Sequence, residues 1–216
     1  MPSRSRHFSL FDRIINHADG ALRTIAGTHT ETLRDNPAGN EPEATLSTEE
    51  QTHAAALMRV NHTGEVCAQA LYQGQALTAR LPRVRKSMNV AAKEEEDHLA
   101  WCEERLKELD SHTSIFNPIW YTMSFGIGAI AGIAGDKWSL GFVEETEIQV
   151  CAHLNEHLEK LPPQDTRSQK ILSQMHDDEA KHALMARRAG AASLPKAIKK
   201  LMASVSKVMT ASAYKL

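Results

Sequence analysis

Apolar residues recur every three or four positions along most of this chain, which is the spacing of one face of an α-helix. Four such stretches have the length of complete helices, at residues 47–79, 83–109, 140–161 and 166–190. Ser47 and Glu50 form a capping box at the start of the first, while Leu81-Pro82 and Pro162-Pro163 separate each helix from its neighbour. Alternation of the strand type is absent. The pattern predicts an all-α fold in which two helical hairpins form a four-helix bundle.

Two further segments precede and follow the hairpins. Leu10 to Ile25 carries an apolar stripe of helical spacing, so we predict an N-terminal amphipathic helix ending near Gly27 and a linker over residues 28–46. Its basic, Ser-rich start is similar to a transit peptide, but acids follow closely and favour a permanent helix. Residues 191–216 predict a C-terminal amphipathic helix with five lysines beside its apolar stripe. The predicted division is therefore residues 1–46, 47–190 and 191–216.

An uncharged segment joins the two hairpins. Thr113 to Gly135 contains no charged residue, and its strongly apolar part, Ile119 to Ala134, is shorter than the about 20 residues of a membrane-spanning helix. We expect a long apolar crossover that is buried or lies on a membrane surface. Residues 126–131 also match a loose dinucleotide-binding pattern, but the strands that such a site requires are absent. Small residues for close packing explain these glycines better.

Composition narrows the class of protein. The 216 residues suffice for one domain with a substantial core, and an apolar fraction of 42% is typical of a soluble globular protein. A net charge of −2 gives no reason to expect a nucleic-acid partner. The three cysteines, Cys67, Cys102 and Cys151, lie far apart. They indicate a reducing compartment and argue against a disulfide framework or a thiolate zinc site.

Acidic residues and histidines interrupt the apolar faces of all four bundle helices. Glu95 and His98 share a face with Met88, Ala91 and Cys102. A carboxylate or an imidazole buried on such a face is costly unless it has a partner, and a metal ion is a common partner. The interrupting residues are Glu65, Glu95, His98, Glu147, Glu179 and His182.

The spacing of these residues repeats. Glu65 precedes the Glu95-x-x-His98 pair by 30 residues, and Glu147 precedes the Glu179-x-x-His182 pair by 32. Two such hairpins packed face to face bring four carboxylates and two imidazoles together, which is the ligand set of ferritin-like di-iron and di-manganese proteins. Oxygen and nitrogen ligands without sulfur disfavour a structural zinc. We predict a dinuclear metal site made by these six residues.

Two other acids are weaker candidates as ligands. Glu144 lies one turn before Glu147 on a similar face, but the near-equal hairpin spacing favours Glu147. Glu50-x-x-His53 has the right pattern but begins 15 residues before Glu65, about 22 Å along the same helix, too far to share a site.

Four other residues have two interpretations each. Glu94 and Asp178 directly precede predicted ligands, so each could orient the histidine of the opposite hairpin or could be a solvated acid. His62 and His153 lie within two turns of Glu65 and Glu147. They could belong to a substrate pocket, although a surface histidine is the default interpretation.

The stretch Leu57-Met58-Arg59-Val60-Asn61-His62-Thr63-Gly64-Glu65, with Ala70 to Gln75 behind it, resembles the demethoxyubiquinone hydroxylase family of ubiquinone biosynthesis. Glu94 to Trp101, Gly141 to His153 and Asp177 to His182 continue the resemblance, which covers about residues 50–190. It implies a ferritin-like fold and a monooxygenase that hydroxylates the ring of a polyprenylated demethoxyubiquinol with O₂. The two iron ions that the resemblance implies, with manganese as the second candidate, would be held by Glu65, Glu95, His98, Glu147, Glu179 and His182.

The resemblance also implies further expectations. His153 matches a family histidine near the substrate, whereas Leu154 stands where some members have tyrosine, so a tyrosine role there does not transfer. We expect a peripheral protein on the cytoplasmic face of the bacterial cell membrane, a homo-oligomer, and a possible complex with other ubiquinone-biosynthesis proteins. No flavin or nicotinamide motif is visible, so electrons would come from a partner, a directly binding reductant or the quinol itself.

Two other classes compete with this interpretation. The first is a ferritin- or rubrerythrin-like iron oxidase or peroxidase. A rubrerythrin normally adds a thiolate iron domain, which this sequence lacks, and a storage ferritin has no need of the long apolar crossover. The second is a bundle that serves only as an interaction module.

Overall fold

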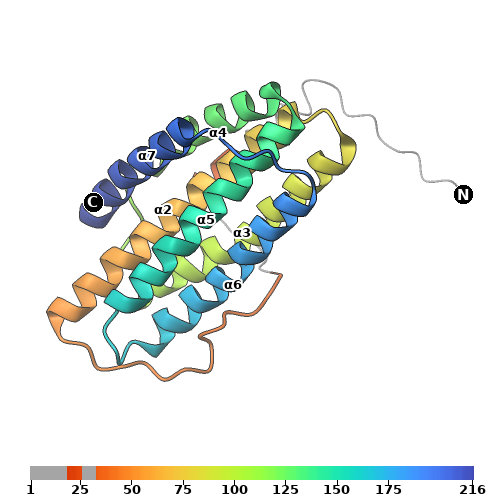
Figure 1. The fold of residues 1–216 in the computed structure, drawn as a ribbon. Coiled ribbons are helices and arrows are strands. Elements are labelled where there is room, and N and C mark those ends of the chain that lie inside the picture. The colour runs from red at the N-terminus through yellow and green to blue at the C-terminus, as the bar shows by residue number, and fades with distance from the viewer. Residues whose placement is uncertain (1–18, 26–32) are drawn as a thin grey trace, which may run out of the picture.

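The computed structural model describes residues 19–25 and 33–216, and within them it contains helices and no strands. Figure 1 shows the helices of a bundle side by side, with α4 and α7 on its outer side. The bundle helices are α2 (Thr48–Thr78), α3 (Pro82–Glu108), α5 (Asp136–Lys160) and α6 (Thr166–Arg188), and the outer helices are α4 (Asn117–Ala134) and α7 (Lys196–Lys215). The predicted all-α bundle of two hairpins is confirmed.

The parts outside the bundle agree with the sequence where the structure describes them. Residues 19–25 are helical, while the rest of the predicted N-terminal helix lies outside the described residues. Residues 33–46 contain no helix, as expected for a linker. The division at residues 46/47 and 190/191 stays a prediction.

Local chemistry fixes where the helices begin. The Ser47 hydroxyl accepts a hydrogen bond from the Glu50 backbone at 3.3 Å, and the Ser47 backbone donates to the Glu50 carboxylate at 2.8 Å, which completes the predicted capping box. The Asp165 carboxylate accepts from the Ser168 backbone at 3.0 Å and caps α6 in the same way. Gly135 has a φ of 116°, a conformation that glycine adopts readily, and it ends α4 one residue before α5 begins.

Of the three apolar core clusters that the described residues form, two lie at opposite ends of the bundle. One contains Met58, Trp101, Leu106, Leu154 and Leu172, and the other contains Tyr72, Val84, Met88, Leu140 and Val143. Along each of the four helices, the predicted metal ligands fall between a residue of one cluster and a residue of the other. The polar residues are therefore enclosed between two water-excluding layers.

The crossover forms a complete helix, α4, which packs closely along α2. A Cβ on Gly128 would lie 2.3 Å from the Leu71 carbonyl oxygen, and a Cβ on Gly74 would lie 2.3 Å from that of Phe125. Only glycine permits so short a separation of the two backbones. The prediction that small residues serve close packing is therefore confirmed for Gly128 but not for Gly126, where an added Cβ would meet no described atom within 4 Å. The dinucleotide alternative is wrong because no strand lies in the described residues.

Helix α7 lies against α2 and α5 but is loosely held, since Ala213 is its one fully buried residue. Its side chains Leu201 and Val208 are 64% and 62% exposed, and Ile130 and Ile133 on α4 are 69% and 63% exposed. Among the described residues, no helix combines the length and hydropathy needed to cross a bilayer.

Residues 33–46, which we call the strap, run across α3 and α6. Ala38 of the strap is fully buried in the core. Glu43 binds Arg105 of α3 through two contacts of 2.7 and 3.0 Å, and Arg105 in turn binds Asp165 at the start of α6 at 2.9 Å. The strap thus connects the two hairpins on the side away from α4 and α7.

Candidate metal centre

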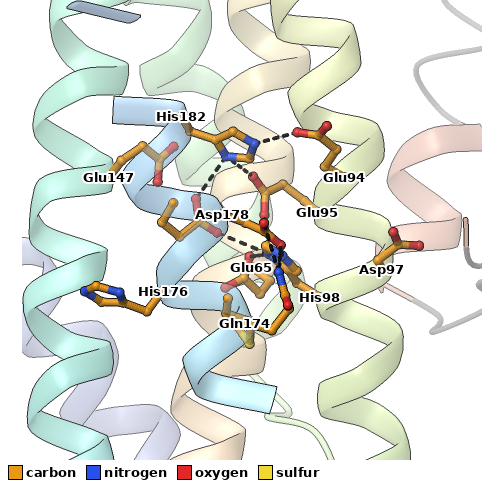
Figure 2. A network of polar contacts seen from close by, with 12 residues as sticks. Glu65, Glu94, Glu95, Asp97, His98, Glu147, Gln174, His176, Asp178 and His182 are labelled. Atoms are coloured by element: carbon orange, nitrogen blue, oxygen red, sulfur yellow. Dashed lines mark hydrogen bonds and ion pairs between the residues drawn. The ribbon is translucent and has the colours of Figure 1, made fainter. Parts of the chain in front are cut away.

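The six predicted ligands meet in the middle of the bundle. All six residues are buried, with exposed fractions between 0% and 4%. Glu65 comes from α2, Glu95 and His98 from α3, Glu147 from α5, and Glu179 and His182 from α6. Figure 2 shows the side chains of Glu65, Glu95, His98, Glu147 and His182 converging between the helices.

The ligand atoms form two overlapping groups. The first is Glu65, Glu95, His98 and Glu179, and the second is Glu95, Glu147, Glu179 and His182. Within each group, one potential ligand atom per residue lies within 4.8 Å of all the others. Glu95 and Glu179 belong to both groups. Two groups with two shared carboxylates are what a pair of adjacent ions requires.

The two imidazoles have the same orientation. His98 Nδ1 lies 3.0 Å from a Glu95 oxygen and 3.1 Å from a Glu179 oxygen, and His182 Nδ1 lies 3.0 Å from a Glu179 oxygen. The Nε2 atoms face outward, 3.2 Å from Asp178 for His98 and 2.6 Å from Glu94 for His182. The predicted contacts of Glu94 and Asp178 with the opposite hairpin's histidine are therefore present. This arrangement aims Nδ1 at the carboxylates and leaves Nε2 for a supporting acid.

Unused carboxylate oxygens support a cation at the centre. One buried oxygen each of Glu65, Glu95, Glu147 and Glu179 lacks a well-directed hydrogen bond within the described part of the chain. Three of these oxygens share a histidine Nδ1, at 3.1 to 3.5 Å, with other carboxylate oxygens, and that of Glu147 has no such contact among the described residues. A buried acceptor without a partner is uncommon and costs free energy. Divalent ions between these oxygens would supply the missing partners, so the residues fit a pair of such ions.

The pKa values of the acids reflect crowded, buried charge. Burial, and then the neighbouring Glu95 charge, raises the pKa of Glu65 to about 7 although contact with His98 opposes the shift. Burial and the charges of Glu179 and Glu95 raise the pKa of Glu147 well above its ordinary value. Without a cation, part of this cluster is therefore protonated near neutral pH.

The histidines carry the opposite charge. Burial alone would lower the pKa of His182, but contacts with Glu179 and Glu95 raise it to about 12. Burial also opposes the shift at His98, where contacts with Asp178 and Glu179 raise the pKa well above its ordinary value. In the metal-free protein, the protonated rings therefore supply the positive charge that metal ions would otherwise supply.

The two acids outside the centre differ in their surroundings. Asp178 has an 8% exposed side chain and is also bound by Arg34 of the strap at 2.6 Å and by Lys181 at 3.0 Å. Burial would raise the pKa of Asp178, but hydrogen bonds from His98 and Arg34 lower it. Glu94 has a 40% exposed side chain, and His182 is its partner.

The structure separates Glu147 from its competitor. Glu147 is 1% exposed and accepts a short hydrogen bond from the Tyr72 hydroxyl. Glu144 instead pairs with the exposed Arg187 at 2.6 Å and is absent from both ligand groups. Glu50 caps α2, and His53 contacts Tyr214 of α7 at 2.7 Å, so neither approaches the centre. The six-ligand assignment itself stays a prediction until metal is measured.

The two uncertain histidines have different positions. His62 is 1% exposed and contacts Glu103 and Asn117, both at 3.3 Å. Its default interpretation as a surface histidine was therefore wrong, because α3 and the start of α4 cover it. His153 lies at the wall of an apolar cavity, as expected for a substrate-pocket residue.

This cavity of about 310 Å³ begins at Glu65 and extends between the bundle and the outer helices. Its few polar residues include Asn61, Thr146 and His153. The apolar residues come from α2, α4, α5 and α7 and include Val60, Leu71, Ile127, Phe142, Leu201 and Val205. A mainly apolar molecule could therefore reach one end of the metal centre without crossing the core.

Sequence reasoning missed two residues that support the centre. Tyr72 lies seven residues after Glu65 and so shares its helix face, a signal that could have identified it. Arg34 lies in the predicted linker, where no helical periodicity indicates the direction of a side chain.

Comparisons with known proteins agree with this geometry. The family described as "Ubiquinone biosynthesis protein COQ7" matches residues 52–213. The chain is 59% identical over 211 residues to the 3-demethoxyubiquinol 3-hydroxylase of Acinetobacter baumannii, covering 98% of this chain and 100% of that protein. Proteins with the same name from Stutzerimonas stutzeri and Pseudomonas fluorescens are 56% and 55% identical, with 100% and 98% of both chains covered.

Proposed function

Since this chain belongs to the COQ7 family of ubiquinone biosynthesis proteins, we propose that it is an O₂-dependent hydroxylase of a demethoxyubiquinol ring. The proposed substrate is a polyprenylated 3-methyl-6-methoxy-1,4-benzoquinol. The observation that carries the proposal is the pair of buried ligand groups that share Glu95 and Glu179, at the end of an apolar cavity.

The proposed cofactor is two iron ions per chain, with manganese as the second candidate. Glu65, Glu95, His98, Glu147, Glu179 and His182 would hold them. When bound, ferrous ions supply the electrons and open coordination positions by which O₂ is activated. One oxygen atom enters a ring C–H bond and the other leaves as water, while a reductant supplies two electrons and two protons.

The protein's own side chains position the ligands and exclude water. Asp178 and Glu94 each accept the Nε2 proton of a histidine, which leaves the Nδ1 lone pair facing the centre. Tyr72 donates to one oxygen of Glu147 and leaves the other free for an ion. The two apolar clusters above and below the centre keep bulk water away from the reacting ring.

The cavity suits an aromatic ring with an isoprenoid tail. Its walls are mainly apolar, and one end lies at Glu65 of the metal centre. We expect the ring at that end and the tail between α4 and α7.

We further propose that the protein lies on the cytoplasmic face of the cell membrane. Support comes from the exposed apolar side chains of α4 and α7 and from the five lysines of residues 194–216. Anionic liposomes should bind the protein, and binding should weaken as salt rises. Deleting residues 194–216 should slow turnover of a long-tailed quinol more than of a short-tailed one. Equal losses would contradict a role in access to lipid.

The homo-oligomer and the complex with other ubiquinone-biosynthesis proteins stay predictions. Analytical ultracentrifugation of the purified chain measures the first. Affinity purification from cells that make ubiquinone tests the second.

The decisive experiment is a quinone profile of cells that lack this chain. A demethoxy precursor should accumulate, and the wild-type chain but not its Glu179→Ala variant should restore ubiquinone. Normal ubiquinone in the deletion strain would overturn the proposal. The alternative, an iron oxidase or peroxidase of the ferritin or rubrerythrin type, instead predicts peroxide consumption by the purified protein that does not depend on added quinol.

A further inference from the structure

Arg34 is the one strap residue that reaches the metal centre in the described part of the chain, and it lies outside residues 52–213 that match the family. Its Nη1 donates to Asp178 Oδ2 at 2.6 Å, and its Nε donates to Asp97 Oδ2 at 2.8 Å. The neighbouring Leu33 backbone donates to the other oxygen of Asp97 at 2.7 Å. Asp97 is on α3 and Asp178 is on α6, so one guanidinium connects both hairpins.

Asp178 connects Arg34 to the predicted ligand His98. Asp178 Oδ2 is shared between Arg34 and His98 Nε2, which lies 3.2 Å away. Arg34 Nη2 is 3.4 Å from the same His98 nitrogen, but a guanidinium cannot accept a hydrogen bond. Asp178 is therefore the acceptor that this arrangement offers to a proton on His98 Nε2.

Packing fixes the guanidinium in place. Its central carbon lies 4.9 Å from the centroid of the Trp101 ring, a separation typical of a cation–π contact. The Trp101 ring lies 5.4 Å from that of His98. Arg34 thus contacts Asp178, and Trp101 beside it contacts His98, on the same side of the metal centre.

We propose that Arg34 is a positioning residue for the metal centre, because it holds Asp178 in the orientation that fixes the ring of His98. The inference rests on the proposed function in requiring that His98 is a ligand. Without Arg34, Lys181 and Gln174 still bind the other oxygen of Asp178 at 3.0 and 3.1 Å. The carboxylate can then turn toward them and hold the His98 ring less firmly. Substitution of a residue that supports a metal ligand typically lowers metal affinity about 10- to 100-fold.

The strap itself provides a matched control. Glu43 attaches the other end of the strap to Arg105 and has no contact with the centre. Glu43→Gln therefore loosens the strap without changing Asp178. Arg34→Lys keeps the positive charge but cannot bind both acids through a planar fork.

The test is Co²⁺ binding by the full-length, metal-free protein, since the visible absorption of Co²⁺ reports its ligand geometry independently of turnover. Arg34→Gln should weaken Co²⁺ binding about 10-fold and change the absorption spectrum, and Arg34→Lys should restore part of both. Glu43→Gln should lower the melting temperature while affinity and spectrum stay as in the wild type.

Two results would overturn the proposal. One is wild-type affinity and spectrum in Arg34→Gln, and the other is an equal loss of affinity in Arg34→Gln and Glu43→Gln. If Arg34→Gln does not fold, Arg34→Lys and Asp97→Asn replace it, because each weakens only part of the network and should give a smaller loss in the same direction. A wild-type protein that binds no Co²⁺ would instead refute the proposed metal centre.

Discussion

The strap side of the bundle and the cavity side surround the same metal centre with opposite kinds of contact. On the strap side, the partly exposed Arg34 joins the strap to α3 and α6 through ion pairs with the buried Asp97 and Asp178. On the cavity side, α4 and α7 cover the bundle with apolar side chains, several of them more than 60% exposed. Directional ion pairs hold a fixed geometry, whereas a loosely packed apolar wall allows a ligand to enter. The difference indicates that the strap side positions the metal ligands and the cavity side admits the substrate.

The largest effect is expected where the two sides meet, at the shared carboxylates. Glu95→Ala or Glu179→Ala should reduce bound metal from about two ions per chain to below one and lower turnover by at least about 100-fold, because each residue belongs to both ligand groups. Metal analysis beside a hydroxylation assay checks this. Glu50 also belongs to a Glu-x-x-His pair but only caps α2. Glu50→Ala should therefore change neither metal content nor turnover. Full metal content in both Glu95→Ala and Glu179→Ala would contradict the assignment of these residues as metal ligands.

The next effect compares the two acids that support the histidines. Asp178→Asn should lower metal affinity about 10- to 100-fold, because the fully buried His98 loses an anion that water cannot replace, and Arg34 loses one of its two carboxylate partners. Glu94→Gln should lower metal affinity less, since the Glu94 side chain is 40% exposed and water can replace it beside His182. Competition with a metal chelator measures both. A larger loss in Glu94→Gln would reverse the comparison.

Removing the metal should make stability depend on pH. The pKa of Glu65 is about 7 in the folded protein against 4.5 ordinarily, so between these values the folded state binds more protons than the unfolded state. The free energy of unfolding of the metal-free protein should therefore fall as pH rises from 5 to 8, by about 3 kcal/mol for this group. The raised pKa values of His98 and His182 add to the fall above about pH 6.5.

Urea unfolding of chelator-treated protein across this range provides the measurement. The metal-loaded protein is the control, and its apparent stability should rise with pH because ions and protons compete for the same atoms. A metal-free protein that becomes more stable from pH 5 to pH 8 would contradict the pKa argument.

The smallest effect tests the packing of α4 on the cavity side. Gly128→Ala places a Cβ 2.3 Å from the Leu71 carbonyl oxygen and should cost about 1–3 kcal/mol of stability as the two helices separate. Gly126→Ala, on the same helix with no atom within 4 Å, should instead stabilise by about 0.5–1 kcal/mol. Urea denaturation of the two variants beside the wild type distinguishes them. Equal effects would mean that α4 is not packed closely on α2.

The two sides also differ in how well the sequence predicts them. Glu65, Glu95, His98, Glu147, Glu179 and His182 could be grouped because each interrupts an apolar stripe whose period fixes the direction of its side chain. Arg34 could not be placed, because it lies in a coil and its partners are 63 and 144 residues away along the chain. His62 was wrongly expected at the surface. It is buried because α3 and α4 pack over it, and the apolar period of α2 alone does not predict how other helices pack.

The crossed pairing of the histidines has a consequence for how the chain folds. His98 needs Asp178, and His182 needs Glu94, so each hairpin supplies an acid for the other's imidazole. During synthesis the first hairpin is complete about 70 residues before Asp178 exists. Its face with Glu65, Glu95 and His98 cannot be buried alone without leaving charges unpartnered. The hairpins therefore do not fold as independent units, and the strap can attach to both helices only when the whole bundle has been made.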